Sequence, residues 1–300
     1  MAISKRHRIL IATDGSPSAQ AALATAVKFP WSASARARAV VARPDWLTGS
    51  SADARAVLVS IAEAAADPVG AADSARRALT PRWGKAEVVS LDERPVDAIL
   101  AEARRFNASV IVVGWRGHGT FQRLLAGSVS RTVAAQAKCP VLVVREAPRA
   151  VRRVVLGFDG CPNAKRALDF LCSLEPKPGS RVVLVNVVEP VSVPASVARL
   201  PASLRGHIRH QASALNEERH RKAQETVEAA IPRLIRHGWA VKGEVRVGAP
   251  LANVLGAADD HRADVLVLGA RATSGIERAL LGSVANGAMN RSSVPVLLVR

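Results

Sequence analysis

The sequence predicts an α/β protein made of two tandem doubly wound domains, each with a parallel five-stranded sheet. Three observations predict this fold. Apolar runs of strand length recur along the chain, Ala-rich stretches of helical length separate them, and the second half repeats the first. Because the runs are apolar at every position, they indicate strands buried on both faces, as in a parallel sheet covered by helices on both sides.

The expected strands and helices alternate along the chain. The clearest strands are the apolar runs Ile9 to Ala12, Val110 to Val113, Val141 to Val144, Val154 to Leu156, Val182 to Val185, Val265 to Leu268 and Val296 to Val299. The clearest helices are the Ala-rich stretches Ser16 to Lys28, Val96 to Arg105, Ala164 to Leu174 and Leu251 to His261. Each half therefore has about five strands with helical connections.

Two constant offsets relate the halves. The segment Ala108 to Arg145 aligns with Ala263 to Arg300 without a gap at an offset of 155, and 15 of 38 positions are identical. Near the start of each half the offset is 145, as from Asp14 to Asp159. Ten extra residues therefore lie within Pro190 to Arg236, where a long helix is expected between the second and third strands. We expect domains at 1–145 and 151–300, joined by the short linker 146–150.

A glycine-rich loop follows the fourth strand of the first half. Gly114 ends the strand, Gly117 follows after two residues, and Gly127 and Ser128 follow after nine more. Glycines at such a turn bring backbone amides close to a ligand without a Cβ in the way. Ser128 is expected to cap the next helix, whose free amides would face the same space, and Arg116 can add a bond to phosphate. The loop therefore predicts an anion site, although it lacks both the Lys-Ser/Thr pair of a Walker A loop and the dinucleotide fingerprint.

This strand, Gly-x2-Gly-x9-Gly-Ser and helix arrangement resembles the ATP-binding motif of universal stress proteins. The run Ile11 to Ser16 resembles the first strand and acidic turn of that family, and Cys139 to Val144 resembles its last strand. The resemblance covers nearly the whole chain twice. It implies the adenine nucleotide α-hydrolase-like fold with strand order 3-2-1-4-5 in each half, with ligands at the carboxyl ends of the strands.

The resemblance also implies which positions contact ATP. The acidic turn residue, Asp14 or Asp159, would contact the nucleoside end, although an Asp in such a turn can equally be only a turn residue or a cap. The backbone at the end of the second strand, at Ala42 or Val187, would hold the adenine. The ribose and phosphate positions, with the loop arginine beside them, are Gly114, Arg116, Gly117, Gly127, Ser128 and Val129 in the first half and Gly269, Arg271, Gly282, Ser283 and Val284 in the second.

The second loop departs from the motif at one position, where Ala272 replaces the glycine equivalent to Gly117. If that residue needs a left-handed backbone, a Cβ costs about 1 kcal/mol. We therefore expect the second site to be weaker, empty or altered.

No catalytic or metal-ligating constellation is visible. The three cysteines have no metal-ligand spacing, and the sequence has no nucleophile elbow or paired carboxylates. We expect ATP as the ligand, with Mg²⁺ bound through its phosphates, in a regulatory or stress-response module. Slow ATP hydrolysis at the same site is the enzymatic alternative.

A net charge of +17 raises a third alternative, binding of nucleic acid or another polyanion. Scattered arginines, and glutamates interleaved with His207, His210 and His220, favour solvated surfaces instead, so nucleic acid is not the expected partner. The absence of a secretory or membrane-length apolar run predicts a cytoplasmic protein without a membrane partner. The resemblance to universal stress proteins also implies that the last strands pair across a two-fold, in a homodimer or an internal pseudo-dimer.

Overall fold

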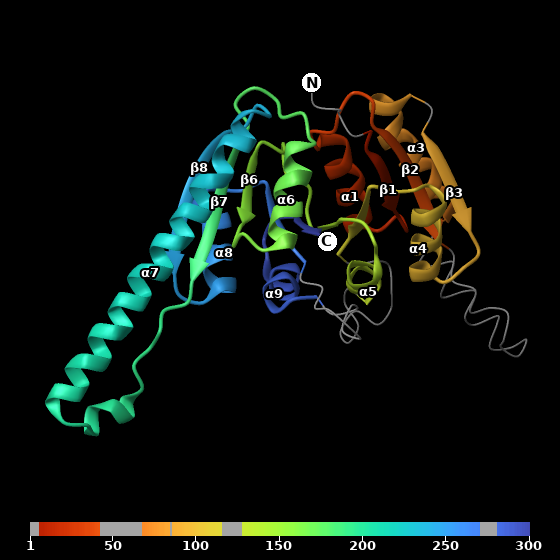
Figure 1. The fold of residues 1–300 in the computed structure, drawn as a ribbon. Helices are drawn as coiled ribbons and strands as arrows, with labels where there is room; N and C mark the ends of the chain where they lie inside the picture. Colours follow the sequence, from red (N-terminus) through yellow and green to blue (C-terminus); the bar gives the residue numbers. More distant parts are fainter. Residues whose placement is uncertain (1–5, 43–67, 85, 116–127, 271–280) are drawn as a thin grey trace, which may run out of the picture.

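A computed structural model describes residues 6–42, 68–84, 86–115, 128–270 and 281–300 (Figure 1). The first half consists of β1 (Arg8–Ala12), α1 (Pro17–Lys28), β2 (Arg36–Ala42), α3 (Pro68–Trp83), β3 (Glu87–Leu91), α4 (Pro95–Arg105), β4 (Val110–Gly114), α5 (Ser128–Gln136) and β5 (Val141–Val144). The second half consists of β6 (Arg153–Gly157), α6 (Pro162–Cys172), β7 (Arg181–Val188), η1 (Ala195–Arg199), α7 (Ala202–Ile235), β8 (Ala240–Val247), α8 (Pro250–Asp260), β9 (Val265–Gly269), α9 (Ser283–Arg291) and β10 (Val296–Val299).

Within the described residues, the strands of both halves join one 10-stranded sheet in the order β3-β2-β1-β4-β5-β10-β9-β6-β7-β8. Each half has the expected order 3-2-1-4-5, and every pair within a half is parallel. The halves meet at β5 and β10, which pair antiparallel with Leu142 opposite Leu297. The last strands therefore form an internal pairing, which is one of the two arrangements that the resemblance implied.

Helices cover both faces of this sheet, as a doubly wound fold requires. Apolar residues of α1, α3, α6 and α7 pack with one set of strand side chains, which includes Ile9 and Leu184. Residues of α4, α5, α8 and α9 pack with the alternate set, which includes Leu10 and Leu266. Alternation of neighbouring residues between the two cores explains why the strands are apolar at nearly every position.

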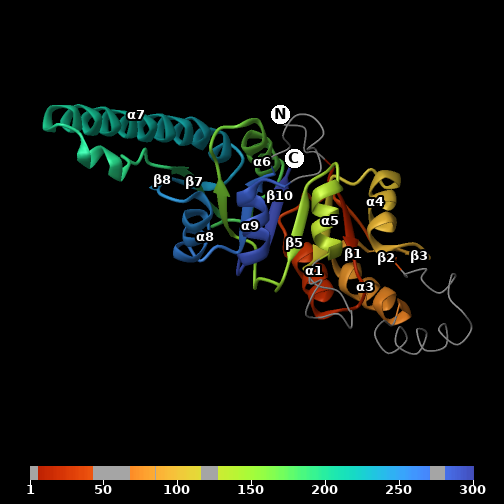
Figure 2. The same ribbon diagram turned by 90° about the horizontal axis from the view of Figure 1, so that it is seen from below.

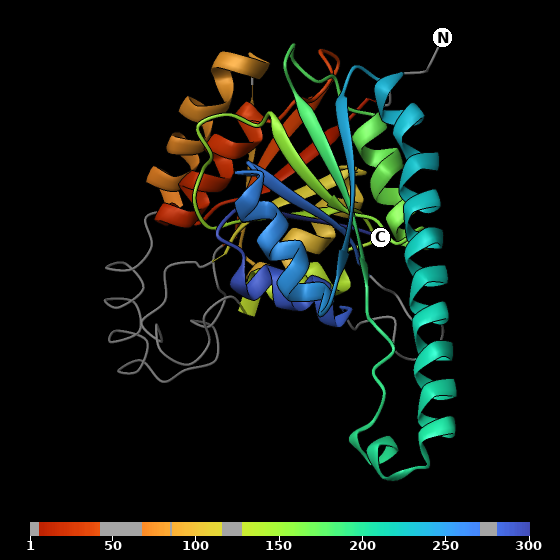
Figure 3. The ribbon, with the colours of Figure 1, turned by 90° about the vertical axis from the view of Figure 1, so that its left-hand side faces the viewer.

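The ten extra residues of the second half lie in the connection between β7 and β8. This connection contains the 34-residue helix α7, whose later turns pack through Val227, Ala230 and Leu234. Its first turns project beyond the carboxyl ends of the strands, with η1 beside them, as an arm (Figures 1 and 3). The position of the insertion was predicted from the change of offset.

Two arginines reinforce the junction between the halves. Arg145, which follows β5, donates to the carbonyls of Met289 (3.2 Å) and Asn290 at the end of α9. Arg300, which follows β10, donates to the carbonyls of Ala134 (2.8 Å) and Ala135 (2.6 Å) at the end of α5. Each half therefore binds the last helix of the other with a cation at its negative dipole end.

Candidate functional site

The candidate site of each half lies at the carboxyl ends of the strands, where the strand order reverses. In the first half this switch point lies between β1 and β4, and in the second it lies between β6 and β9. The connections leave neighbouring strands toward opposite faces there, so the loops separate and leave room for a ligand. Figure 2 shows this edge from below, with α5 and α9 close to the centre of the molecule.

The acidic turns after β1 and β6 have the same geometry. The amide of Ser16 donates to Asp14 Oδ1 over 3.0 Å, and the amide of Cys161 donates to Asp159 Oδ1 over 3.0 Å. Glycine follows each aspartate with a left-handed backbone, at φ +80° for Gly15. The carboxylates therefore shape their turns as Asx-type acceptors, and this structural role is compatible with a ligand role at the same turn.

The helices that follow these turns begin at the site. Ser16 caps α1, since its Oγ accepts the amide of Ala19 over 3.2 Å. In the second half Cys161 has this position, and its Sγ accepts the amide of Ala164 over 3.4 Å. Burial and a hydrogen bond to Asp159 raise the pKa of the Cys161 thiol. The thiol is therefore protonated at neutral pH and serves as a weak cap.

The first glycine of each loop is required for packing. A Cβ on Gly114 would lie 2.6 Å from the carbonyl carbon of Ser18 in the first turn of α1. A Cβ on Gly269 would lie 2.7 Å from the carbonyl carbon of Asn163 in α6. These glycines allow the helix starts to approach the ends of β4 and β9, and thereby position the turns of the site.

Ala42 and Val187 lie at the ends of β2 and β7, as expected for the adenine side of the site. Ala42 is the last residue of β2 and is paired with Leu91, whereas Val187 precedes the last residue of β7 and is paired with Arg246. Both are partly exposed. The structure therefore places them at the carboxyl edge of the sheet, one strand away from the acidic turns.

The phosphate side is described only in part. Helix α5 begins at Ser128, and in α9 the N-cap is Gly282, without a capping side chain. Ser128 was expected to be the N-cap residue, but the serine of each loop is instead the first residue of its helix. In α9 the cap position belongs to the preceding glycine, Gly282. Val129 and Val284 lie in the same first turns. Outside the described residues are Arg116, Gly117, Gly127, Arg271 and Ala272.

Two anchoring side chains were not identified from the sequence. Asn163 donates from Nδ2 to the carbonyl of Ala270 over 2.7 Å, and Ser130 donates from Oγ to the carbonyl of Trp115 over 3.0 Å. Both bonds are buried and fix the residue that starts the loop after β9 or β4. A polar residue in the first turn of a helix at the switch point is the signal that could have found them.

The middle turns of α7 carry charges that pair with one another. Arg221 pairs with Glu218 (2.6 Å) and Glu225 (2.5 Å), and Lys222 pairs with Glu218 (3.0 Å). Such i, i+3 and i, i+4 pairs are typical of a solvated helix face. Among the described residues, no group of His, Cys, Asp and Glu could hold a metal ion, and no helix is both long and apolar enough to cross a membrane.

Comparison with known proteins assigns the family. The family model "Universal stress protein family" matches residues 5–145 and again 150–300. A universal stress protein of Mycobacterium tuberculosis is 25% identical over 199 residues, which are 64% of this chain and 62% of that protein. The match thus spans less than two thirds of that relative. A second, from Thermus aquaticus, is 46% identical over 59 residues, 20% of this chain and 43% of that protein.

A solved structure supports the same architecture over the whole chain. The universal stress protein from Archaeoglobus fulgidus DSM 4304 covers 98% of this chain and 96% of its own, with a TM-score of 0.66 and 20% identity. At that identity the likeness concerns the fold. Together with the double match of the family model, the observed strand order and the two acidic turns, it leads to one conclusion: the chain belongs to the universal stress protein family and carries two of its domains in tandem.

Proposed function

We propose that the protein binds ATP at the carboxyl edge of its first half and that the second half holds a weaker or altered site. One observation carries the proposal. In each half, an acidic turn follows one strand, and the neighbouring strand leads to a helix that begins at a Gly-Ser pair. Uncapped amides at a helix start favour a phosphate group.

The described residues have distinct roles in this proposal. The carboxylate of Asp14 would accept hydrogen bonds from ribose hydroxyls, and the backbone at Ala42 would pair with the edge of the adenine. The amides at the start of α5 would hold the phosphates, which would carry Mg²⁺ as oxygen ligands. Asp159, Val187, Ser283 and Val284 would have these roles in the second half.

The proposed activity is regulated binding rather than turnover. The acidic turn carboxylate is already an acceptor for a backbone amide, at 3.0 Å from the nitrogen of Ser16. Hydrolysis would need a positioned water in addition to bound phosphates. A steady-state ATPase assay with Gly117→Ala as control tests the alternative, since turnover that disappears with binding would make the protein a slow hydrolase.

The test is calorimetric titration of ATP with matched variants. We expect Asp14→Ala and Gly117→Ala each to weaken binding in the first half by about tenfold or more, equivalent to about 1.4 kcal/mol. Ala272→Gly should strengthen or create binding in the second half. Gly206→Ala is the control, because a Cβ there meets no atom within 4 Å and the residue lies on the arm.

Two results would overturn the proposal. One is wild-type affinity in folded Asp14→Ala and Gly117→Ala proteins, and the other is the absence of any saturable ATP binding. Mass spectrometry of small molecules released from denatured, freshly purified protein provides an independent readout of which nucleotide is retained.

A further inference from the structure

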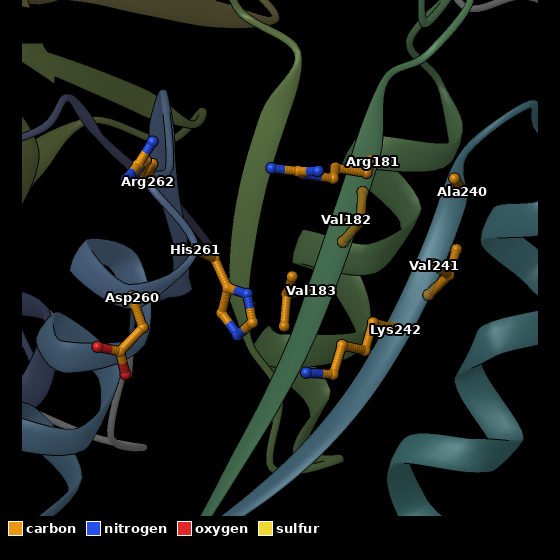
Figure 4. A pocket seen from close by; sticks show the side chains of 9 residues that line it. All are labelled: Arg181, Val182, Val183, Ala240, Val241, Lys242, Asp260, His261 and Arg262. Carbon is orange, nitrogen blue, oxygen red and sulfur yellow. The ribbon is translucent and has the colours of Figure 1, made fainter.

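A hollow lies at the opposite end of the strands from the candidate nucleotide site. Its volume is about 550 Å³, within the range of small-molecule sites. It opens beside the first residues of β7 and β8 and the end of α8 (Figure 4). The residues that line it are Arg181, Val182, Val183, Ala240, Val241, Lys242, Asp260, His261 and Arg262.

The first half fills the equivalent space with its own side chains. Arg38 on β2 pairs with Glu102 of α4 (2.5 Å) and with Glu87 of β3, and its guanidinium lies 4.4 Å from the centre of the Phe106 ring. Glu102 is completely buried. This cluster, called the plug below, fills the space between the sheet and the end of α4.

The second half lacks this plug. With the two offsets, Arg38 corresponds to Val183 and Glu102 to Ala257, so both members of the buried ion pair are replaced by short apolar side chains. Phe106 corresponds to His261, whose Nε2 lies 2.7 Å from Glu244 Oε2. The lost side-chain volume accounts for the hollow.

The charge of the rim has changed together with its volume. By the same offset Glu87 corresponds to Lys242 and Asn107 to Arg262, which adds positive charge to the rim. Arg105 corresponds to Asp260 and Val89 to Glu244, which adds negative charge, but Glu244 is bound by His261 and Arg246. The side chains of Arg181 and Lys242 extend from the strands toward the helix end that carries His261 and Arg262 (Figure 4). The one carboxylate among the lining residues, Asp260, is already bound by Arg246 at 2.8 Å.

The two rim arginines have no acidic partner in the described part of the chain. No ion pair or side-chain hydrogen bond joins Arg181 or Arg262 to any described residue, whereas Arg38, Arg153 and Arg246 all bind carboxylates. Lys242 lies 3.8 Å from Glu244 with 65% of its side chain exposed. Unneutralised cations around a small apolar floor make a site that favours an anion.

We propose that this hollow binds a small organic anion with an apolar body, of the class of an aryl carboxylate. Val183 and Ala240, which share the face of the sheet that carries Arg181, would contact the apolar body. Arg181 and Arg262 would bind the carboxylate, for which the planar guanidinium has two parallel donors. The site is separate from the carboxyl edge and does not depend on nucleotide binding.

The probe is 2-naphthoate, titrated by calorimetry and by methyl chemical-shift mapping, with neutral 2-naphthamide as the chemical control. We expect saturable binding, with the largest shifts at the methyl groups of Val183 and Ala240. Arg181→Gln combined with Arg262→Gln should weaken binding at least tenfold. Arg199→Gln combined with Arg209→Gln removes the same charge from exposed positions of the arm and its approach, and should change the affinity by less than twofold.

A second variant tests the shape of the site. Val183→Arg combined with Ala257→Glu restores the ion pair of the first half and should abolish 2-naphthoate binding while ATP affinity stays unchanged. The proposal is overturned if 2-naphthoate does not bind, if its shifts map to other residues, or if the amide binds equally well. It is also overturned if the protein with Arg181→Gln and Arg262→Gln retains wild-type affinity. That result does not depend on whether the protein with Val183→Arg and Ala257→Glu folds.

Discussion

Replacing Arg145 with Met should loosen the junction between the two halves. The guanidinium donates to two carbonyls at the end of α9 and lies 4.2 Å from the centre of the Trp115 ring. A hydrogen bond from a charged donor contributes about 1.5–3 kcal/mol net, and a cation over an indole adds about 0.5–1 kcal/mol, so the two bonds and the ring contact together give about 3.5–7 kcal/mol. Because Arg145 is only half-buried, solvent screening reduces this value, and we expect a loss of about 2–4 kcal/mol.

Thermal unfolding followed by circular dichroism measures this loss. For domains of this size, about 2–4 kcal/mol corresponds to a fall in Tm of about 5–10 °C. Methionine preserves an unbranched apolar stem, so the comparison isolates the donors and the charge. Arg149→Met is the control, since it removes the same charge from an exposed position in the linker. If the Arg145→Met protein has the same Tm as the Arg149→Met protein, the claim that this contact binds the halves together is refuted.

Three further outcomes test other parts of the structure. Gly114→Ala should lower the free energy of unfolding by about 1–3 kcal/mol in urea titrations, because its Cβ would lie 2.6 Å from the carbonyl carbon of Ser18; wild-type stability would contradict the packing role. Burial raises the pKa of Cys139 to about 11, so at pH 8 only about one thousandth of this thiol is ionised, and iodoacetamide should label native protein there far more slowly than unfolded protein. Burial opposes ionisation of Glu244, but hydrogen bonds led by that from His261 outweigh it and lower its pKa. The resulting stability is present above the pKa of the unfolded state and is lost as pH falls through the lower, folded value, so Glu244→Gln should flatten the acid limb of a stability profile between about pH 3 and 5; an unchanged limb would contradict it.

The sheet could be predicted because its pattern is redundant. Strands buried on both faces leave uninterrupted apolar runs, and the duplication shows each run twice, so Val141 to Val144 and Val296 to Val299 confirm each other. The pairing of these two runs across a two-fold followed from the resemblance. A long helix was expected between the second and third strands, but its bounds were not, because the first turns of α7 pack against little and leave no apolar stripe that marks where the helix begins.

The candidate site was predicted less completely than the fold. Asp14 and Gly114 lie at the carboxyl ends of the strands, where the resemblance implies a ligand. The close approach of Ser18 to Gly114 is visible only in three dimensions. The buried bond from Asn163 to Ala270 also joins residues remote in sequence. A sequence motif identifies the residue types that a site needs. Only the packing shows which of these residues position the site without contacting the ligand.

The hollow beside β7 shows how the duplicated halves could diverge at a buried charge. An arginine opposite Ala257, or a glutamate opposite Val183, would leave a charge without its partner on the covered face of the sheet. Breaking one side of such a pair costs about 3–5 kcal/mol, whereas replacing both members by apolar residues is often neutral. The observed halves hold the two tolerated combinations, Arg38 with Glu102 and Val183 with Ala257. Replacement of both members of the pair therefore allows the two halves to differ without leaving an unpaired buried charge. The first half has the ion pair in this space, and the second half has a hollow that a ligand can fill.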